Sequence, residues 1–164
     1  MNNVSRRNFK DGKAKRDRGR FLTLPATVLE SQSYARLTPY AVKLLLDIGS
    51  QYRGDNNGDL CVAWKIMKVK GWRSEATLAK AKQALLQAGF IAETRKGYRP
   101  NVCSLYALTW HALDPCTKHD AGAARAFVFG GWKANEPVPP IPKQRRVPVK
   151  NAVLTTPAVV EHAV

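Results

Sequence analysis

The stretch from Gly71 to Ile91, GWRSEATLAKAKQALLQAGFI, constrains the fold more than any other part of the chain. Its apolar residues Leu78, Ala81, Leu85 and, to one side, Leu86 recur at the spacing of an α-helix. Arginine, threonine, lysine and glutamine occupy the remaining positions. The pattern predicts an amphipathic helix with one side for a core and a polar side for solvent or a partner.

This helix has start and stop signals, and a hairpin follows it. Ser74 is a good N-cap, Glu75 in the first turn suits the helix dipole, and Gly89 ends the helix. The segments FIAETR (90–95) and NVCSLYALTW (101–110) then read as two strands joined by KGYRP. We therefore expect a helix followed by a β-hairpin with a basic tip.

An earlier helix is predicted in LTPYAVKLLLDIGSQYRGDNNGDL. Thr38 is its N-cap and Pro39 occupies the first helical position, where a missing N–H has no cost. Gly54 and the Asp-Asn-Asn-Gly run are expected to end it. Its buried stripe is expected to comprise Ala41, Leu44, Leu45, Ile48 and Tyr52.

Shorter elements complete the pattern. FLTLPATVLES predicts an extended piece and one helical turn after Pro25, DLCVA (59–63) a short strand, and WKIMKVKGW (64–72) a short helix that stops at Gly71. The order is helix, strand, helix, turn, helix, strand, basic loop, strand. This α+β order is that of a winged helix, a helix-turn-helix with a β-hairpin wing.

The charge of the chain predicts a polyanionic partner. Its 27 Lys and Arg residues against 12 Asp and Glu give a net charge of +15, which suits nucleic acid or an anionic membrane surface. No run approaches the roughly 18 apolar residues of a membrane span, and the N-terminus lacks the apolar region of a secretory signal. Three cysteines favour a reducing compartment, so we expect a cytoplasmic protein.

Four regions are expected along the chain. Residues 1–20 predict a disordered basic arm, 21–114 the winged-helix domain, 115–136 a short appendage, and 137–164 a flexible, proline-rich basic tail. The arm either enters a DNA groove or acts as a general electrostatic tether. The tail contains two P-x-x-P spacings, so binding to a protein partner is an alternative to a role as a flexible linker. The arm residues expected near DNA are Arg16, Arg18 and Arg20.

Candidate DNA contacts follow from the helical projection. If Leu78 and Leu85 face the core, a set of polar residues points outward. These residues suit a major groove, because Arg forms bidentate hydrogen bonds with guanine and Gln with adenine. The alternatives are an ordinary solvated helix face and a hairpin tip that is charged only for solubility. The expected base contacts are Arg73, Thr77, Lys80 and Gln83; the phosphate contacts are Lys65, Lys68, Lys70 and Lys82; the wing contacts are Arg95, Lys96, Tyr98 and Arg99.

Metal and catalytic patterns are weak. Asp55, Asn57 and Asp59 match the first three ligand positions of an EF-hand calcium loop. The sixth position of such a loop requires glycine and the twelfth requires glutamate, but this chain has Leu60 and Ile66 there. There is no phosphate-binding loop, no dinucleotide fingerprint and no metalloprotease or serine-hydrolase motif. We expect no enzyme, no cofactor and no metal. Four residues are of the types that bind zinc, namely Cys103, His111, Cys116 and His119. Only the Cys116-x-x-His119 pair has the close spacing of a zinc site.

Several segments together resemble a known group of proteins. They are FLTLPATVLESQSYARLTPYAVKLLLDI, YRGDNNGDL, LAKAKQALLQAGFIAETRKG and LYALTW. The chain from about Phe21 to Asp114 resembles small helix-turn-helix proteins of bacterial plasmids, phages and integrated mobile elements, related to winged-helix plasmid replication proteins. The resemblance implies a winged-helix DNA-binding fold in which the helix from Ser74 to Ala88 recognises DNA.

These observations predict a sequence-specific protein that binds double-stranded DNA, most simply a transcriptional repressor of a mobile element. One alternative is an accessory factor in plasmid or phage replication initiation or partition, with the same DNA contact. Another is a non-specific RNA-binding or architectural DNA-binding protein. Because one such module covers a half-site, a homodimer or several copies on DNA are expected.

Overall fold

The computed structural model describes residues 19–98, 100 and 102–135. This part of the chain is an α+β domain that contains one three-stranded antiparallel sheet with the strand order β1-β3-β2. The strands are β1 (Leu60–Cys61), β2 (Ile91–Arg95) and β3 (Leu105–Leu108). The predicted arm up to residue 18 and the predicted tail from residue 137 lie outside the described residues.

The helices follow the predicted order. After α2 and α3, the order α4, β1, α5, α6, β2, β3 agrees with the helix, strand and hairpin pattern of the sequence. The short α3 was not predicted, although Ser31 caps it by accepting a hydrogen bond from the Tyr34 N–H at 3.0 Å. The helices are α2 (Ala26–Leu29), α3 (Gln32–Ala35), α4 (Pro39–Gly49), α5 (Trp64–Val69), α6 (Glu75–Gln87), α7 (Ala123–Ala126) and the 3-10 helix η1 (Gly131–Asn135).

Helix α4 begins as predicted. The Thr38 hydroxyl accepts a hydrogen bond from the Ala41 N–H at 3.3 Å, and Pro39 occupies the first helical position. The cap satisfies one of the amides that a helix start leaves unpaired.

The predicted end of α4 is wrong. The helix ends at Gly49 rather than near Gly54, so Tyr52 lies beyond it. The reason is the side chain of Gln51, which pairs with the backbone of Cys61 as a neighbouring strand would. Its amide donates to the Cys61 carbonyl and its oxygen accepts from the Cys61 N–H, both at 3.0 Å.

Helix α6 agrees with its prediction at both ends. The Ser74 hydroxyl accepts from the Thr77 N–H at 3.3 Å, and Gly89 follows the last turn with a φ of 74°. Its apolar side is buried and packs against the buried stripe of α4. The buried residues of α6 are Leu78, Ala81 and Leu85.

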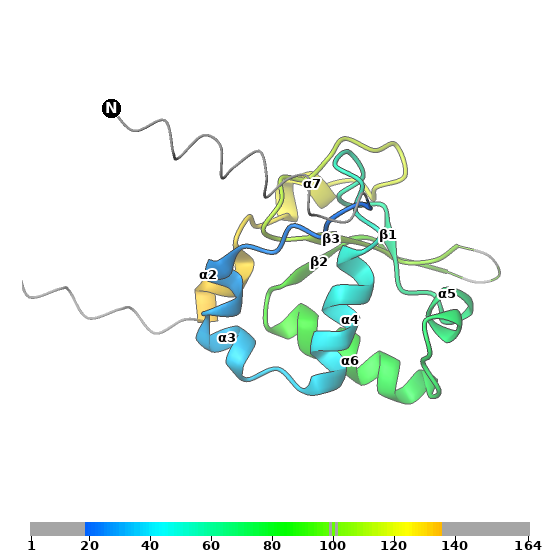
Figure 1. Cartoon of the computed structure of the whole chain (residues 1–164). Helices are drawn as coiled ribbons and strands as arrows, with labels where there is room; N and C mark the ends of the chain where they lie inside the picture. The colour runs from blue at the N-terminus through cyan, green and yellow to red at the C-terminus, as the bar shows by residue number, and fades with distance from the viewer. Residues whose placement is uncertain (1–18, 99, 101, 136–164) are drawn as a thin grey trace, which may run out of the picture.

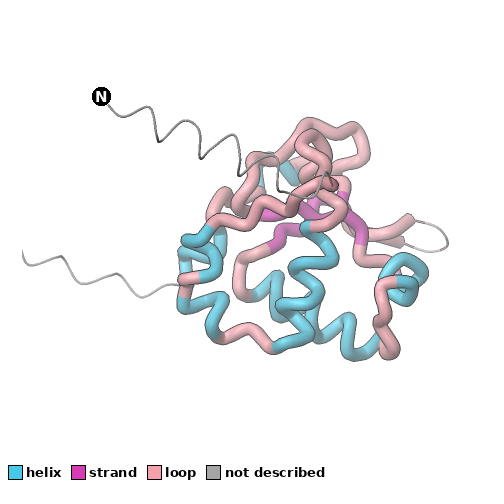
Figure 2. Tube along the Cα trace, viewed as in Figure 1, coloured by secondary structure: helices cyan, strands magenta, loops and turns pink. Residues whose placement is uncertain are grey.

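The sheet is covered on both faces. Every residue of β3 is buried, and Tyr106 and Leu108 belong to the same core as the residues of α4 and α6. Alternate residues of a strand face opposite sides, so Leu105 and Ala107 are buried on the other face. In Figure 1 the sheet lies between α4 and α6 on one side and the segment that carries α7 on the other. Figure 2 shows that this covering segment is mostly loop.

A buried asparagine holds the turn before β1. The sequence predicted only a turn at DNNGD, yet Asn57 is 1% exposed. Its side-chain amide donates to the carbonyls of Leu108, His111 and Ala112 at 2.9, 3.2 and 2.8 Å, and its oxygen accepts from the Leu108 N–H at 2.7 Å. Asn57 therefore ties the turn before β1 to the chain that leaves β3.

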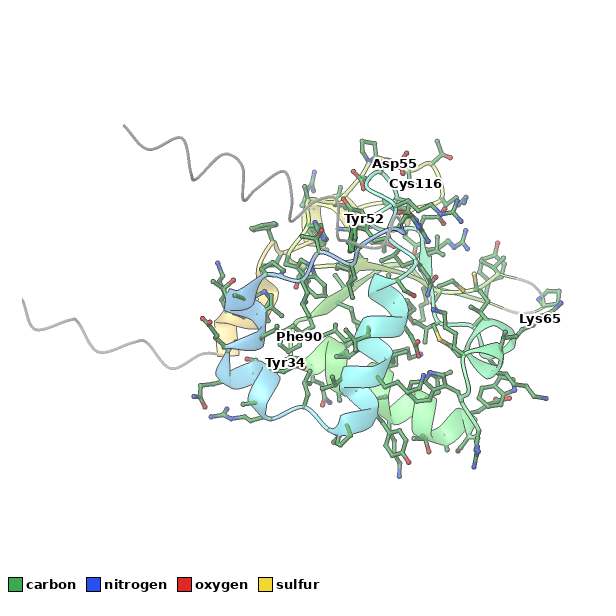
Figure 3. The ribbon with its side chains drawn as sticks, in the orientation of Figure 1. Tyr34, Tyr52, Asp55, Lys65, Phe90 and Cys116 are labelled. Carbon is green, nitrogen blue, oxygen red and sulfur yellow. The ribbon has the colours of Figure 1, made fainter. Side chains whose placement is uncertain are left out.

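The segment after the predicted domain also contributes to the core. The Trp132 ring is buried and stacks on Phe90, which Figure 3 labels, with 6.2 Å between ring centroids. The Ser33 hydroxyl donates to the Trp132 carbonyl at 3.0 Å. A Cβ on Gly89 would lie 2.5 Å from the carbonyl carbon of Gly131, so this packing requires glycine. In the part of the chain that the structure describes, no helix has the length and apolar character needed to cross a membrane.

Candidate nucleic-acid interface

One side of α6 is exposed and polar. Because its opposite side packs on α4, Arg73, Lys80 and Gln83 are exposed together, with the small Ala76 between them. Thr77 is partly buried and lies at the border of this surface. The structure therefore exposes three of the four predicted base contacts, Arg73 just before α6 and Lys80 and Gln83 on it, and leaves Thr77 partly buried.

A groove runs beside the first turn of α6. Its volume is about 420 Å³. Tyr40, at the start of α4, is 60% exposed, and its ring lies 6.3 Å from that of the buried Trp72. Sequence reasoning did not select Tyr40, although an aromatic residue outside the apolar stripe of α4 was a usable signal. The groove is lined by Tyr40, Lys43, Gly71, Trp72, Arg73, Ser74 and Thr77.

A second groove lies beside the last turns of α6. Its volume is about 390 Å³, and the exposed Arg36, also absent from the prediction, is part of its wall. The two grooves follow the side of α6 that faces α3 and the start of α4. The second groove is lined by Ser33, Arg36, Leu37, Thr38, Ala84, Gln87 and Ala88.

The carboxylate of Asp47 holds the turn between α5 and α6 against α4. Its Oδ2 accepts from the indole N–H of Trp72 at 2.8 Å and from Lys43 Nζ at 2.7 Å. Lys43 Nζ also donates to the Lys70 carbonyl at 3.0 Å and lies 5.1 Å from the Trp72 ring centroid. Lys70 Nζ donates to the Ser50 hydroxyl at 2.6 Å and lies 3.8 Å from Asp47 Oδ1. Lys70, predicted to bind phosphate, is thus engaged within the fold.

Helix α5 exposes the other two predicted phosphate ligands of this region. Lys65 and Lys68 are exposed, and among the described residues neither ammonium group forms a hydrogen bond or an ion pair. In Figure 1, α5 and the far end of the β2–β3 hairpin lie toward the same edge of the view, and Figure 3 labels Lys65 there. These lysines are available to a partner.

Lys82 does not share the exposed side of α6 with Lys80. It is partly buried, and its ammonium lies 5.9 Å from the ring centroid of Tyr106 on β3. Two residues along an α-helix correspond to a rotation of about 200°. Lys82 thus lies near Tyr106 of the sheet rather than beside Lys80, and its predicted phosphate contact stays a prediction.

The predicted contacts in the β2–β3 hairpin differ in whether their side chains are bonded within the fold or exposed. Arg95 binds the Cys103 carbonyl through Nε at 3.1 Å and Nη2 at 3.0 Å, so it stabilises the hairpin rather than projecting from it. The side chain of Lys96 is exposed, while its N–H donates to Asp120 Oδ2 at 2.7 Å. Tyr98 is 68% exposed. Of the predicted hairpin contacts that the structure describes, Lys96 and Tyr98 are exposed.

The remaining predicted contacts lie toward the N-terminus and the hairpin tip. Arg20 is exposed and lines a polar groove of about 470 Å³ together with Arg53 and Lys70. The contacts predicted at Arg16, Arg18 and Arg99 fall outside the described residues.

The residues considered for zinc do not form a metal site. Within residues 19–98, 100 and 102–135, no three or more His, Cys, Asp or Glu side chains gather closely enough to hold a metal ion. Burial lowers the pKa of His111, whose ring lies 4.3 Å from that of Tyr52. The Nε2 atoms of His111 and His119 are buried without a hydrogen-bond partner among these residues.

Comparison of the chain with protein-family models, with curated proteins and with solved structures found no match.

Proposed function

We propose that this chain is a winged-helix protein that binds double-stranded DNA and represses transcription in a bacterial mobile element. The observation that carries the proposal is the packing of α6. The apolar side of this capped helix lies on α4, while Arg73 just before the helix and Lys80 and Gln83 on it are exposed, together with Glu75 of the first turn. A helix of this kind fits a major groove, where arginine and glutamine distinguish bases.

The residue roles follow from exposure. Arg73, Lys80 and Gln83 contact base edges, with Thr77 at the border of the contact. Lys65 and Lys68 on α5 bind phosphates, since they are exposed and unpaired among the described residues. The groove residues Arg36 and Tyr40 extend the contact along the DNA backbone. The hairpin contributes Lys96 and Tyr98, and Arg20 begins the arm.

Three predicted contacts receive structural roles in this proposal. Lys70 holds the α5–α6 turn, Lys82 packs on the sheet and Arg95 braces the hairpin. The protein acts in the bacterial nucleoid as a homodimer or in several copies, because one module spans only a half-site.

The first experiment measures affinity for random-sequence duplex DNA as a function of salt. If about 6 to 8 phosphates are neutralised, log K falls against log salt with a slope of roughly −5 to −7. A flat response removes the nucleic-acid proposal. Selection of bound sequences from a random duplex pool then separates the roles: a palindromic motif supports a dimeric repressor, direct repeats support a replication factor, and no motif supports a non-specific binder.

Single substitutions then locate the interface. Lys80→Ala and Lys96→Ala are expected to weaken binding, and Gln83→Ala to change the preferred base at one position by about 1–3 kcal/mol. The matched control is Arg125→Ala, since Arg125 is exposed on α7, across the sheet from α6. If Arg125→Ala reduces affinity as much as Lys80→Ala does, DNA binding depends on the overall positive charge of the chain and not on a specific contact made by α6.

A further inference from the structure

Two cysteines meet at the base of the hairpin. Cys61 in β1 pairs with Leu105 of β3, and Cys103 lies two residues before Leu105. Cys103 lies just before β3, and its side chain is near enough to the Cys61 thiol to help raise the pKa of that thiol. Both cysteines are free and partly buried. The third cysteine, Cys116, lies in the loop after β3.

Arg95 places a cation against one of the two sulfurs. Its Nη2 lies 3.6 Å from Cys103 Sγ, and the same guanidinium binds the Cys103 carbonyl. A cation in contact with a sulfur stabilises the negative charge that the sulfur carries when it attacks an oxidant. Cys61 has the opposite environment, since burial raises its pKa to about 11. Cys103 is therefore suited to attack an oxidant, and Cys61 to follow as the second thiol.

We propose that Cys61 and Cys103 form a reversible disulfide when the protein meets a peroxide, and that this bond shifts the hairpin. In the first step the Cys103 thiolate attacks one oxygen of hydrogen peroxide and breaks the O–O bond. The products are a sulfenic acid at Cys103 and hydroxide, which takes a proton to become water. In the second step the Cys61 sulfur attacks the Cys103 sulfur, loses its proton, and releases the sulfenic oxygen as water. Both sulfurs are oxidised and the peroxide is reduced.

The bond moves the hairpin because the two sulfurs are unbonded in the structure and have to approach to about 2.05 Å in a disulfide. The chain at Cys103 therefore moves toward β1 when the bond forms. Arg95 follows through its bonds to the Cys103 carbonyl, and the bridge between Tyr98 and Val102 lies one residue further along the hairpin. Only the consequence for DNA rests on the proposed function.

The experiment treats the full chain with hydrogen peroxide and maps disulfides in protease digests kept under non-reducing conditions. The expected product is a peptide pair joined through Cys61 and Cys103, which dithiothreitol separates. Cys116→Ser is the matched control and retains this product, while Cys61→Ser and Cys103→Ser abolish it. A bond made mainly through Cys116, or the absence of a Cys61–Cys103 bond, overturns the proposal.

Two further measurements test the mechanism. Arg95→Gln is expected to slow formation of the bond by about ten-fold, because the cation beside the sulfur is lost. Hydrogen exchange at the amides of Tyr98 and Val102 is expected to rise in the oxidised protein, and unchanged exchange contradicts the movement of the hairpin. Affinity for random duplex DNA is then compared before and after oxidation. If the reduced protein does not bind DNA, the proposed function fails while the disulfide map still decides the redox proposal.

Discussion

Removal of the Asp47 carboxylate tests how the turn before α6 is held in place. In Asp47→Ala the indole N–H of Trp72 loses its acceptor, and Trp72 is only 4% exposed. A buried donor without a partner costs about 1–3 kcal/mol. The ion pairs with Lys43 and Lys70 involve side chains that are 43% and 30% exposed, so each adds at most about 1 kcal/mol. We expect Asp47→Ala to lower the free energy of unfolding by about 2–3 kcal/mol.

A second variant separates the hydrogen bond from the charge. In Asp47→Asn an amide oxygen still accepts from the Trp72 indole, so only the two ion pairs are lost; the expected cost is at most about 2 kcal/mol and smaller than that of Asp47→Ala. The assay is urea unfolding followed by tryptophan fluorescence, in which a lower midpoint at unchanged slope reports lost stability. Asp55→Ala is the control, because Asp55 is exposed on the turn after α4. The reasoning is refuted if both Asp47 variants lose the same stability, or if Asp47→Ala behaves like Asp55→Ala.

Three further outcomes are expected. Asn57→Ala leaves buried backbone groups of the β3 end unpaired, so urea unfolding should show a loss of about 3–4 kcal/mol, and a loss below 1 kcal/mol would contradict the role of Asn57. Gly89→Ala should destabilise the protein more than Gly71→Ala: both residues have positive φ, but only at Gly89 does an added Cβ meet backbone, that of Gly131, within 2.5 Å. Burial lowers the pKa of His111 below 6.5, so the unfolded state binds more protons and stability is lost as pH falls from 6.5 through the folded-state pKa. In His111→Gln, unfolding measured across that range should depend less on pH.

Local signals in the sequence determined the order of the elements from α4 to β3. The caps at Thr38 and Ser74 and the stop at Gly89 act within one helical turn, so short windows of sequence contain all their determinants. The apolar spacing of α6 likewise predicted which of its residues are buried, and with them the exposure of Arg73, Lys80 and Gln83. Whether these residues contact DNA remains a prediction.

Only the tertiary structure decided which side chains find partners far away in the sequence. Gln51 ends α4 early because β1 offers it a backbone to bind, and Asn57 becomes buried because the end of β3 surrounds it with carbonyls. Lys70, Lys82 and Arg95 are basic residues that charge alone could not distinguish from Lys65 or Lys80. They differ because the fold brings a carboxylate, an aromatic ring or a carbonyl within reach of each. Periodicity reports the side of a helix that a residue occupies, while contacts between distant segments determine what that residue meets.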